Sequence, residues 1–306
     1  MKKIFNSFIT LVEYNFSTLI LITILKLIVI LVVLCVESKV FYMHSTTFFN
    51  NEFFYKPKVT AHRASAAIAP ENTLAGFKES FLSGAEYIEI DIQETKDGEL
   101  ILLHDSNFKR TTGIDKNVWE VNYDEVKTYD AGSHFSPSFT GEKIPTLKEV
   151  IKFSKDKTKL IIEMKHDNNI NSNIEEKVVN LVKTNKIENQ CIIASSNKEI
   201  LRRVKELDSK IVTCFMTKVT YSKFYDLDYI DIYGIESNFV NKNVVNNIHE
   251  RGKQVFVWTI NEQSLIKKMI DLKVDSIITD NPYMVKDIIY PQKNKFMNIL
   301  ANYLFP

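Results

Sequence analysis

Residues 87–92 read YIEIDI, and this stretch decides the fold. Isoleucines alternate with Glu89 and Asp91, which is the two-residue period of a β-strand, whose successive side chains point to opposite faces. If the isoleucines face a layer of helices, both acids face the interior of a closed sheet. Carboxylates buried there need a cation or another partner. The stretch therefore predicts a barrel strand with acids on its inner face.

Other short apolar runs flank this strand and alternate with stretches of helical period. The predicted strands are 58–62, 87–92, 99–104, 159–164, 191–195, 210–215, 229–235, 254–260 and 274–279. The predicted helices are 73–83, 146–154, 174–186, 197–207, 241–251, 262–272 and 282–289, with start signals at Asn72-Thr73 and Asn261-Glu262. Strands that alternate with helices indicate a parallel sheet, and eight or nine of them over about 230 residues favour a closed (β/α)8 TIM-type barrel.

One part of the pattern leaves the barrel strands undecided. The runs 87–92 and 99–104 are joined through Lys96-Asp97-Gly98, which is too short for a crossover helix. Whether both runs are barrel strands stays open at this stage. The Gly- and Pro-punctuated stretch 106–145 is interpreted as an excursion over the mouth of the barrel.

Composition and charge exclude several classes of protein. The chain has 306 residues, 45% hydrophobic and 25% charged, which is ordinary for a folded globular protein. Lys and Arg number 39 against 38 Asp and Glu, so no excess of positive charge indicates nucleic-acid binding. The cysteines form no CxxC pair, and Cys191 and Cys214 lie in apolar runs that predict buried, inert thiols. No Gly-rich dinucleotide or P-loop motif follows the first strand.

The N-terminal region is divided into a segment 1–15, an apolar stretch 16–36 and a linker 37–56. Of the 21 residues in 16–36, 17 are apolar, enough to cross a hydrocarbon core of about 30 Å as a helix despite the cost of Lys26. A cleaved signal peptide would have a shorter apolar core and a small-residue cleavage site, and a buried core helix would need a partner on every face. We therefore expect one transmembrane helix and a single-pass protein of the cell membrane. Lys2 and Lys3 predict an inside N-terminus and place the domain 57–290 outside.

Polar residues gather at four predicted strand ends. These are His62-Arg63, the pair Glu89 and Asp91, His104, and the pair Glu163 and Lys165. In a parallel barrel the carboxyl ends of the strands converge on one mouth, so we expect these side chains to meet. Three carboxylates without Cys ligands suggest one hard divalent cation, Mg²⁺ or Ca²⁺. Two histidines suit acid and base catalysis, and the Arg and Lys suit a phosphate group, so the set predicts phosphoryl transfer to water or to an internal hydroxyl.

A series of motifs in this chain resembles the glycerophosphodiester phosphodiesterase family over residues 57–290. The motifs are His62-Arg63, Pro70-Glu71-Asn72-Thr73, Glu89-Ile90-Asp91, Thr95-Lys96-Asp97-Gly98, His104-Asp105, Arg110-Thr111-Thr112-Gly113, Ile144-Pro145-Thr146-Leu147, Glu163-Met164-Lys165, Trp258-Thr259 and Ile278-Thr279-Asp280-Asn281-Pro282. The resemblance implies a TIM-type barrel and hydrolysis of glycerophosphodiesters to sn-glycerol 3-phosphate and an alcohol. It also implies a metal held at Glu89, Asp91 and Glu163, acid and base catalysis at His62 and His104, and phosphate contacts from Arg63 and Lys165.

Several alternatives stay open beside this resemblance. Trp258 ends a predicted strand and either walls the substrate pocket or fills the barrel; it is kept as a candidate substrate-binding residue. Ala64 stands where most members of the family carry Gly, which concerns the shape of the phosphate pocket. A phospholipase acting on lysophospholipids or other membrane lipid phosphodiesters, and a non-catalytic phosphodiester-binding module, are the alternative functions. The tail 291–306 is predicted to lie on the membrane or on the barrel, and the oligomeric state is not predicted.

Overall fold

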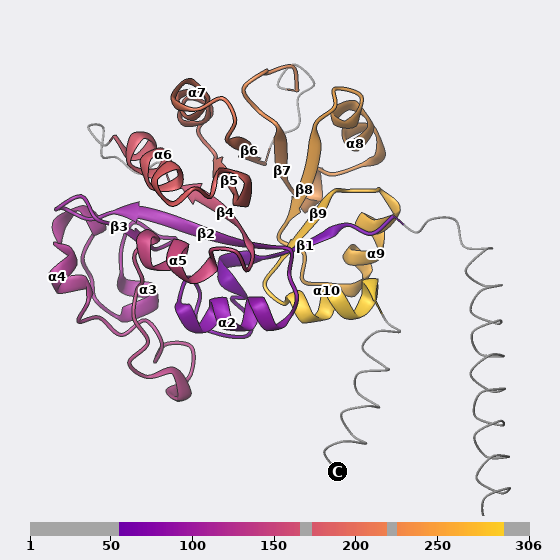
Figure 1. Ribbon diagram of the computed structural model, residues 1–306. Helices are drawn as coiled ribbons and strands as arrows, with labels where there is room; N and C mark the ends of the chain where they lie inside the picture. Colours follow the sequence, from indigo (N-terminus) through magenta and orange to yellow (C-terminus); the bar gives the residue numbers. More distant parts are fainter. Residues whose placement is uncertain (1–54, 166–172, 219–224, 291–306) are drawn as a thin grey trace, which may run out of the picture. The chain divides into compact units, whose positions relative to one another are not determined.

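The computed structural model describes residues 55–165, 173–218 and 225–290 (Figure 1). The predicted transmembrane helix at 16–36, the linker up to residue 54, Cys35 and the tail 291–306 lie outside these residues. Among the helices that are described, none combines the length and the apolar character that crossing a bilayer requires. The anchor therefore stays a prediction from the sequence.

Eight parallel strands close into a barrel, as the alternating pattern predicts. The strands are β1 (Lys58–Ala61), β2 (Tyr87–Glu94), β4 (Lys159–Met164), β5 (Cys191–Ser195), β6 (Val212–Thr217), β7 (Ile232–Glu236), β8 (Gln254–Trp258) and β9 (Ser276–Thr279). Neighbours follow the order β1-β9-β8-β7-β6-β5-β4-β2, and pairing of β1 with β2 closes the ring. Every pairing in this ring is parallel, which confirms a closed TIM-type barrel.

The main helices lie around this barrel where the helical periods place them (Figure 1). They are α2 (Leu74–Leu82), α5 (Leu147–Ser154), α6 (Ile174–Asn185), α7 (Lys198–Leu207), α8 (Lys242–His249), α9 (Gln263–Asp271) and α10 (Pro282–Ile289). Each agrees with its predicted range to within two residues at either end. Thr73 caps α2 by accepting a hydrogen bond from Gly76 N–H, as predicted. The predicted start signal at Asn261 is wrong as a cap, because neither it nor Glu262 caps α9.

The second run of the undecided pair is not a barrel strand. It forms β3 (Leu100–Leu102), which pairs antiparallel with β2 outside the ring. Gly98 makes the connecting turn with φ = 85°, a left-handed conformation that glycine adopts without steric cost. The chain then makes the predicted excursion, which contains the short helices α3 (Lys109–Thr112) and α4 (Tyr123–Val126). A hydrophobic cluster of its own holds the excursion together, with Phe108 and Val126 fully buried.

The faces of β2 are those that its sequence predicts. Ile88, Ile90 and Ile92 belong to the large core between the barrel and its helices. The barrel interior holds a separate apolar cluster, and its buried members are Tyr87, Ile161, Ile192, Ala194, Cys214, Met216, Ile232, Phe256 and Ile278. Cys191 and Cys214 are both buried free thiols, as predicted, and burial raises the pKa of Cys191 to about 12. The acids of β2 lie on the interior face, toward the carboxyl end of the barrel.

Candidate active site

Three carboxylates come together at the carboxyl end of β2 and β4. Asp91 and Glu163 are direct cross-strand partners, and Glu89 lies two residues before Asp91 on the same face. Each of the three offers one oxygen, and these oxygens lie within 4.8 Å of one another. The residues are buried, with 1%, 1% and 9% of their surface exposed for Glu89, Asp91 and Glu163. The structure thus brings together the three acids that the sequence singled out.

The cluster fits one hard divalent cation. All of its donors are carboxylate oxygens, the ligands that Mg²⁺ and Ca²⁺ prefer. Glu89 Oε2 accepts a hydrogen bond of 2.8 Å from the Arg63 backbone N–H, whereas Glu89 Oε1 is buried without a hydrogen-bond partner. A buried, unpartnered carboxylate oxygen is costly unless a cation or a proton satisfies it. Glu89 Oε1 is therefore the atom that most directly indicates a ligand at this site.

The pKa values of the three acids report the same crowding. Burial, followed by the charges of Asp91 and Glu163, raises the pKa of Glu89 to about 8. Burial and Asp91 also raise the pKa of Glu163, against the opposing charge of Lys165. Burial acts in the same direction on Asp91, but the charges of Lys165, His104 and Arg63 outweigh it and lower its pKa below the ordinary value. Burial and mutual repulsion thus oppose the ionisation of Glu89 and Glu163, whereas the neighbouring cations favour that of Asp91.

Two cations lie against this cluster. Lys165 Nζ is 2.7 Å from Asp91 Oδ1 and 3.0 Å from Glu163 Oε2. Burial lowers the pKa of Lys165, but the three carboxylates outweigh burial and hold it above its usual range. Arg63 Nε lies 3.6 Å from Asp91 Oδ2 and is buried without a hydrogen-bond partner. Both side chains thus lie beside the carboxylates, and their contact with a phosphate stays a prediction.

His62 follows β1 and is oriented by a carboxylate from the far end of the chain. Its Nδ1 lies 2.6 Å from Asp280 Oδ1, and Asn261 Nδ2 donates to the second oxygen of Asp280 at 2.5 Å. Asn261 Oδ1 also accepts from the Asp280 backbone N–H, so this residue supports Asp280 rather than capping α9. Burial lowers the pKa of His62, but the Asp280 hydrogen bond and the charge of Glu89 outweigh it, so its pKa lies above the usual value. With Nδ1 engaged, Nε2 is the ring nitrogen left for proton transfer.

His104 is oriented by a longer chain of contacts. Its Nδ1 lies 2.7 Å from Asp105 Oδ1, and Arg110 Nε donates to Asp105 Oδ2 at 2.6 Å. Arg110 also binds Glu71 through both terminal nitrogens, each at 2.7 Å. Because Arg110 lies on α3, these contacts connect the excursion to the mouth of the barrel where the carboxylates lie. His104 acts on the pKa values of both Asp91 and Glu163, which places it beside the same cluster.

The turn that carries His62 is left-handed. Arg63, Ala64 and Ser65 have φ values of 45°, 58° and 71°. Ala64 therefore holds a left-handed conformation that glycine would adopt freely and that costs an alanine about 1–2 kcal/mol. A Cβ at Gly76 would lie 2.3 Å from the Ala64 carbonyl oxygen, so α2 packs directly on this turn. The exchange of Gly for Ala is accommodated with the motif intact.

Trp258 lies at the carboxyl end of β8, partly buried against the apolar interior cluster. Its Nε1–H donates to the Gly234 carbonyl at 2.9 Å. The ring thus packs against the apolar cluster of the barrel interior at the carboxyl end of its strand. Its role in binding substrate stays a prediction.

Several residues that orient the catalytic candidates were given no role in the site from sequence. They are Asp280 and Asn261 beside His62, Asp105, Arg110 and Glu71 beside His104, and Asn72 beside Asp91. Asp280 directly follows β9, so its place at a strand end was the available signal. Asn72 has a left-handed backbone, with φ = 57°. Its Nδ2 donates to Asp91 Oδ2 at 2.9 Å, a contact that no local sequence pattern predicts.

Three comparisons with known proteins, by family model, by sequence and by structure, find phosphodiesterases. The model of the Glycerophosphoryl diester phosphodiesterase family matches residues 62–284. A glycerophosphodiester phosphodiesterase from Caldanaerobacter subterraneus subsp. tengcongensis is 34% identical over 238 residues, covering 76% of this chain and 98% of the relative. A lysophospholipase D from Mus musculus is 26% identical, covering 75% of this chain and 85% of the relative. The solved structure of an Oleispira antarctica phosphodiesterase in complex with the product sn-glycerol-3-phosphate has a TM-score of 0.69 at 28% identity, covering 77% of this chain and 97% of that one.

Proposed function

Because this chain belongs to the glycerophosphoryl diester phosphodiesterase family, we propose that it hydrolyses glycerophosphodiesters to sn-glycerol 3-phosphate and an alcohol. The family assignment confirms the resemblance carried by the motifs and makes the chain a phosphoric diester hydrolase. One observation carries the proposal for this site. Two histidines, each held at Nδ1 by a carboxylate, lie beside three buried carboxylates, two of which share a lysine.

The residues divide the chemical work as follows. One histidine removes the proton from the nucleophile, either water or a substrate hydroxyl next to the phosphate, and the other protonates the leaving alkoxide. Both present Nε2, so the geometry suits either assignment of acid and base. Lys165 and Arg63 stabilise the negative charge that grows on the phosphate oxygens. Glu89, Asp91 and Glu163 would hold one Mg²⁺ or Ca²⁺, which supplies further stabilisation of that charge.

The proposal includes the membrane as a partner. The apolar stretch 16–36 supports a single-pass anchor in the cell membrane, with the catalytic domain on the outer side by the charge of Lys2 and Lys3. A second candidate substrate, a lysophospholipid or another membrane lipid phosphodiester, is favoured by the similarity to the mouse lysophospholipase D. A non-catalytic phosphodiester-binding module is disfavoured, because both histidines and all three carboxylates are present.

The test is a substrate panel with the full chain in detergent. We expect release of glycerol 3-phosphate from glycerophosphocholine, and loss of that release in EDTA. His62→Asn should abolish turnover, whereas His249→Asn should leave it unchanged. His249 is a matched control because its Nε2 also pairs with a carboxylate, that of Asp275 at 2.8 Å, away from the site. Faster turnover of lysophospholipid vesicles than of soluble diesters would select the second substrate, and full turnover in excess EDTA would contradict the role of the metal.

A further inference from the structure

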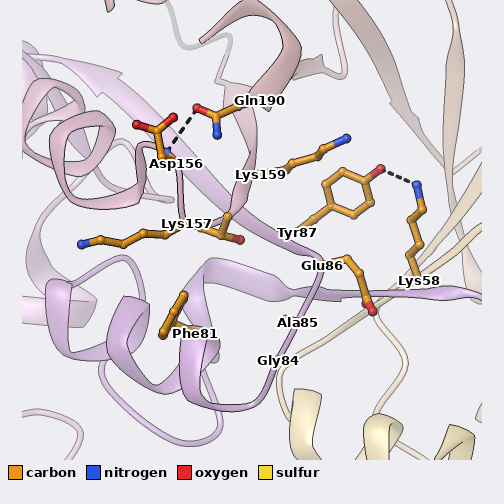
Figure 2. Close-up of a pocket in the computed structure, with 11 residues that line it drawn as sticks. Lys58, Phe81, Gly84, Ala85, Glu86, Tyr87, Asp156, Lys157, Lys159 and Gln190 are labelled. Carbon is orange, nitrogen blue, oxygen red and sulfur yellow. Dashed lines mark hydrogen bonds between the residues drawn. The ribbon is translucent and has the colours of Figure 1, made fainter.

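A cavity of about 650 Å³ opens at the amino-terminal ends of β1, β2 and β4, the end of the barrel opposite the carboxylates (Figure 2). Lys58, Tyr87 and Lys159 come from these strand ends, and Phe81 of α2, with 50% of its surface exposed, lies at the edge. None of these residues takes part in the chemistry proposed above. The cavity is therefore a separate place on the molecule.

Strand register places two of the cavity's three lysines, Lys58 and Lys159, on one face with its tyrosine. Tyr87 is the direct cross-strand partner of Lys159 and of Thr60, which lies two residues after Lys58. Since side chains alternate along a strand, Lys58, Tyr87 and Lys159 all project on the interior side of the sheet. Figure 2 shows the amino groups of Lys58 and Lys159 extending to the side of the Tyr87 hydroxyl.

The donors of this group are available. Within residues 55–165, 173–218 and 225–290, neither Lys58 nor Lys159 forms a salt bridge. Lys58 Nζ donates to the Tyr87 hydroxyl at 3.1 Å and lies 5.3 Å from the centre of its ring. The hydroxyl accepts this bond and keeps its own proton to donate. Two ammonium groups and one phenol O–H thus face the same space.

The acids of the cavity wall do not neutralise these donors. Glu86 is already engaged, since one oxygen accepts from Lys286 Nζ and the other from the Val59 N–H at 2.8 Å. Asp156 lies beside Gln190, whose side-chain oxygen accepts its backbone N–H (Figure 2). In that view Asp156 is at the far end of the cavity from Lys58. The end near the tyrosine therefore carries net positive charge.

We infer that Lys58, Tyr87 and Lys159 form a second anion site, which binds a phosphate group at the amino-terminal mouth of the barrel. Ammonium groups and a hydroxyl donor match the several acceptor oxygens of a phosphate. The exposed Phe81 at the edge offers an apolar contact to an organic or lipid portion attached to that phosphate. The phosphate comes from a soluble ester or from the headgroup of a lipid, and the experiment separates these sources.

The experiment measures how fast an amine-reactive acetylating reagent modifies individual lysines of the full chain, by mass spectrometry. In one arm the protein is in neutral detergent, with inorganic phosphate or with chloride at equal ionic strength. In the other it is in bilayers of phosphatidylcholine with or without phosphatidylglycerol. Lys268 on α9, which is exposed and forms no salt bridge among the described residues, is the matched control. At ten times the dissociation constant each site lysine is free about one tenth of the time, so its acetylation slows about tenfold.

Each outcome is decisive. Protection of Lys58 and Lys159, but not Lys268, by inorganic phosphate assigns the site to a soluble phosphate. The same pattern only with phosphatidylglycerol assigns it to lipid headgroups. Tyr87→Phe should reduce the protection several-fold, because it removes one donor and the bond that orients Lys58. Equal acetylation with and without both anions, equal protection of Lys268, or full protection in the variant would overturn the site.

Discussion

Replacing Glu163 by glutamine removes one charge from the carboxylate cluster and keeps the size of the side chain. In the metal-free protein, the repulsion of Glu163 by the other carboxylates opposes its attraction to Lys165, and both contribute to the free energy of unfolding. Where both carboxylates are ionised, oxygens within 4.8 Å repel by about 3–4 kcal/mol per pair at an effective dielectric of about 20, and this repulsion weakens as the pH falls below the raised pKa of Glu89, about 8. The contact of 3.0 Å with Lys165 attracts by about 5–6 kcal/mol on the same scale.

Two further terms favour the variant. Removing a buried charge recovers a desolvation cost of several kcal/mol, and Lys165 keeps its contact of 2.7 Å with Asp91. We therefore expect the free energy of unfolding of metal-free Glu163→Gln to be unchanged or slightly higher than that of the wild type. The charge that destabilises the empty cluster is the charge that binds a cation.

Metal should separate the two proteins. An ion that binds only the folded state at 100 times its dissociation constant stabilises it by about 2.7 kcal/mol. For a domain of this size that corresponds to a rise in Tm of about 5–10 °C. The wild type should show this rise with Mg²⁺ or Ca²⁺ in thermal melts, and Glu163→Gln should show much less of it, together with a large loss of activity.

Glu94→Gln is the matched control for this experiment. Glu94 lies on β2, the strand of Glu89 and Asp91, and its carboxylate pairs with Lys177 at 2.6 Å outside the cluster. This variant should keep the full metal response. If instead Glu163 is only a structural partner of Lys165, Glu163→Gln should melt earlier than the wild type without metal and respond to metal in full. That result would refute the placement of Glu163 among the metal ligands.

Three other variants test the supporting residues. Asp280→Asn replaces the carboxylate whose charge-assisted hydrogen bond raises the pKa of His62 by a neutral amide, so the step of the pH–rate profile due to His62 should move to lower pH. The His62–Asp280 pair also stabilises the folded wild type. Thermal melts across pH should show that this stability is lost as the pH rises through the raised pKa of His62. They should show it lost again as the pH falls through the lowered pKa of Asp280. Arg110→Gln should lower kcat up to about 100-fold with little change in KM, because it misplaces His104, and steady-state kinetics measures this. Gly76→Ala places a Cβ 2.3 Å from a backbone oxygen and should cost about 1–3 kcal/mol in denaturant unfolding.

The barrel and the carboxylates were predictable because they depend on short-range rules. A two-residue period tells which side chains share a face, and parallel strands bring their carboxyl ends to one mouth. From these rules alone, Glu89, Asp91 and Glu163 had to lie together once the ring closed. The same rules brought His62 and His104 to that mouth as candidate acid and base, the resemblance implied the same roles, and the structure places both beside the cluster.

The orienting contacts were not predictable because they join residues far apart in the chain. His62 and Asp280 are 218 positions apart, and Arg110 and Glu71 are 39 apart. Periodicity places each residue on its own element but does not say which loops meet. Asn261 is the clearest case, since its position before α9 resembles a cap while its amide binds Asp280. The place of β3 outside the ring likewise depends on its pairing with β2, which the run of apolar residues does not reveal.

The same alternation accounts for opposite charges at the two ends of the barrel interior. On β2 the interior face carries Tyr87, then Glu89, then Asp91; on β4 it carries Lys159, an isoleucine and Glu163. The apolar interior cluster fills the space between these ends and keeps water and ions from passing through it. A phosphate at the amino-terminal mouth would therefore meet Lys58, Lys159 and the Tyr87 hydroxyl, while a cation at the carboxyl mouth would meet carboxylates at its ligand positions. Two sites of opposite charge preference can coexist in one barrel because its two ends are chemically independent.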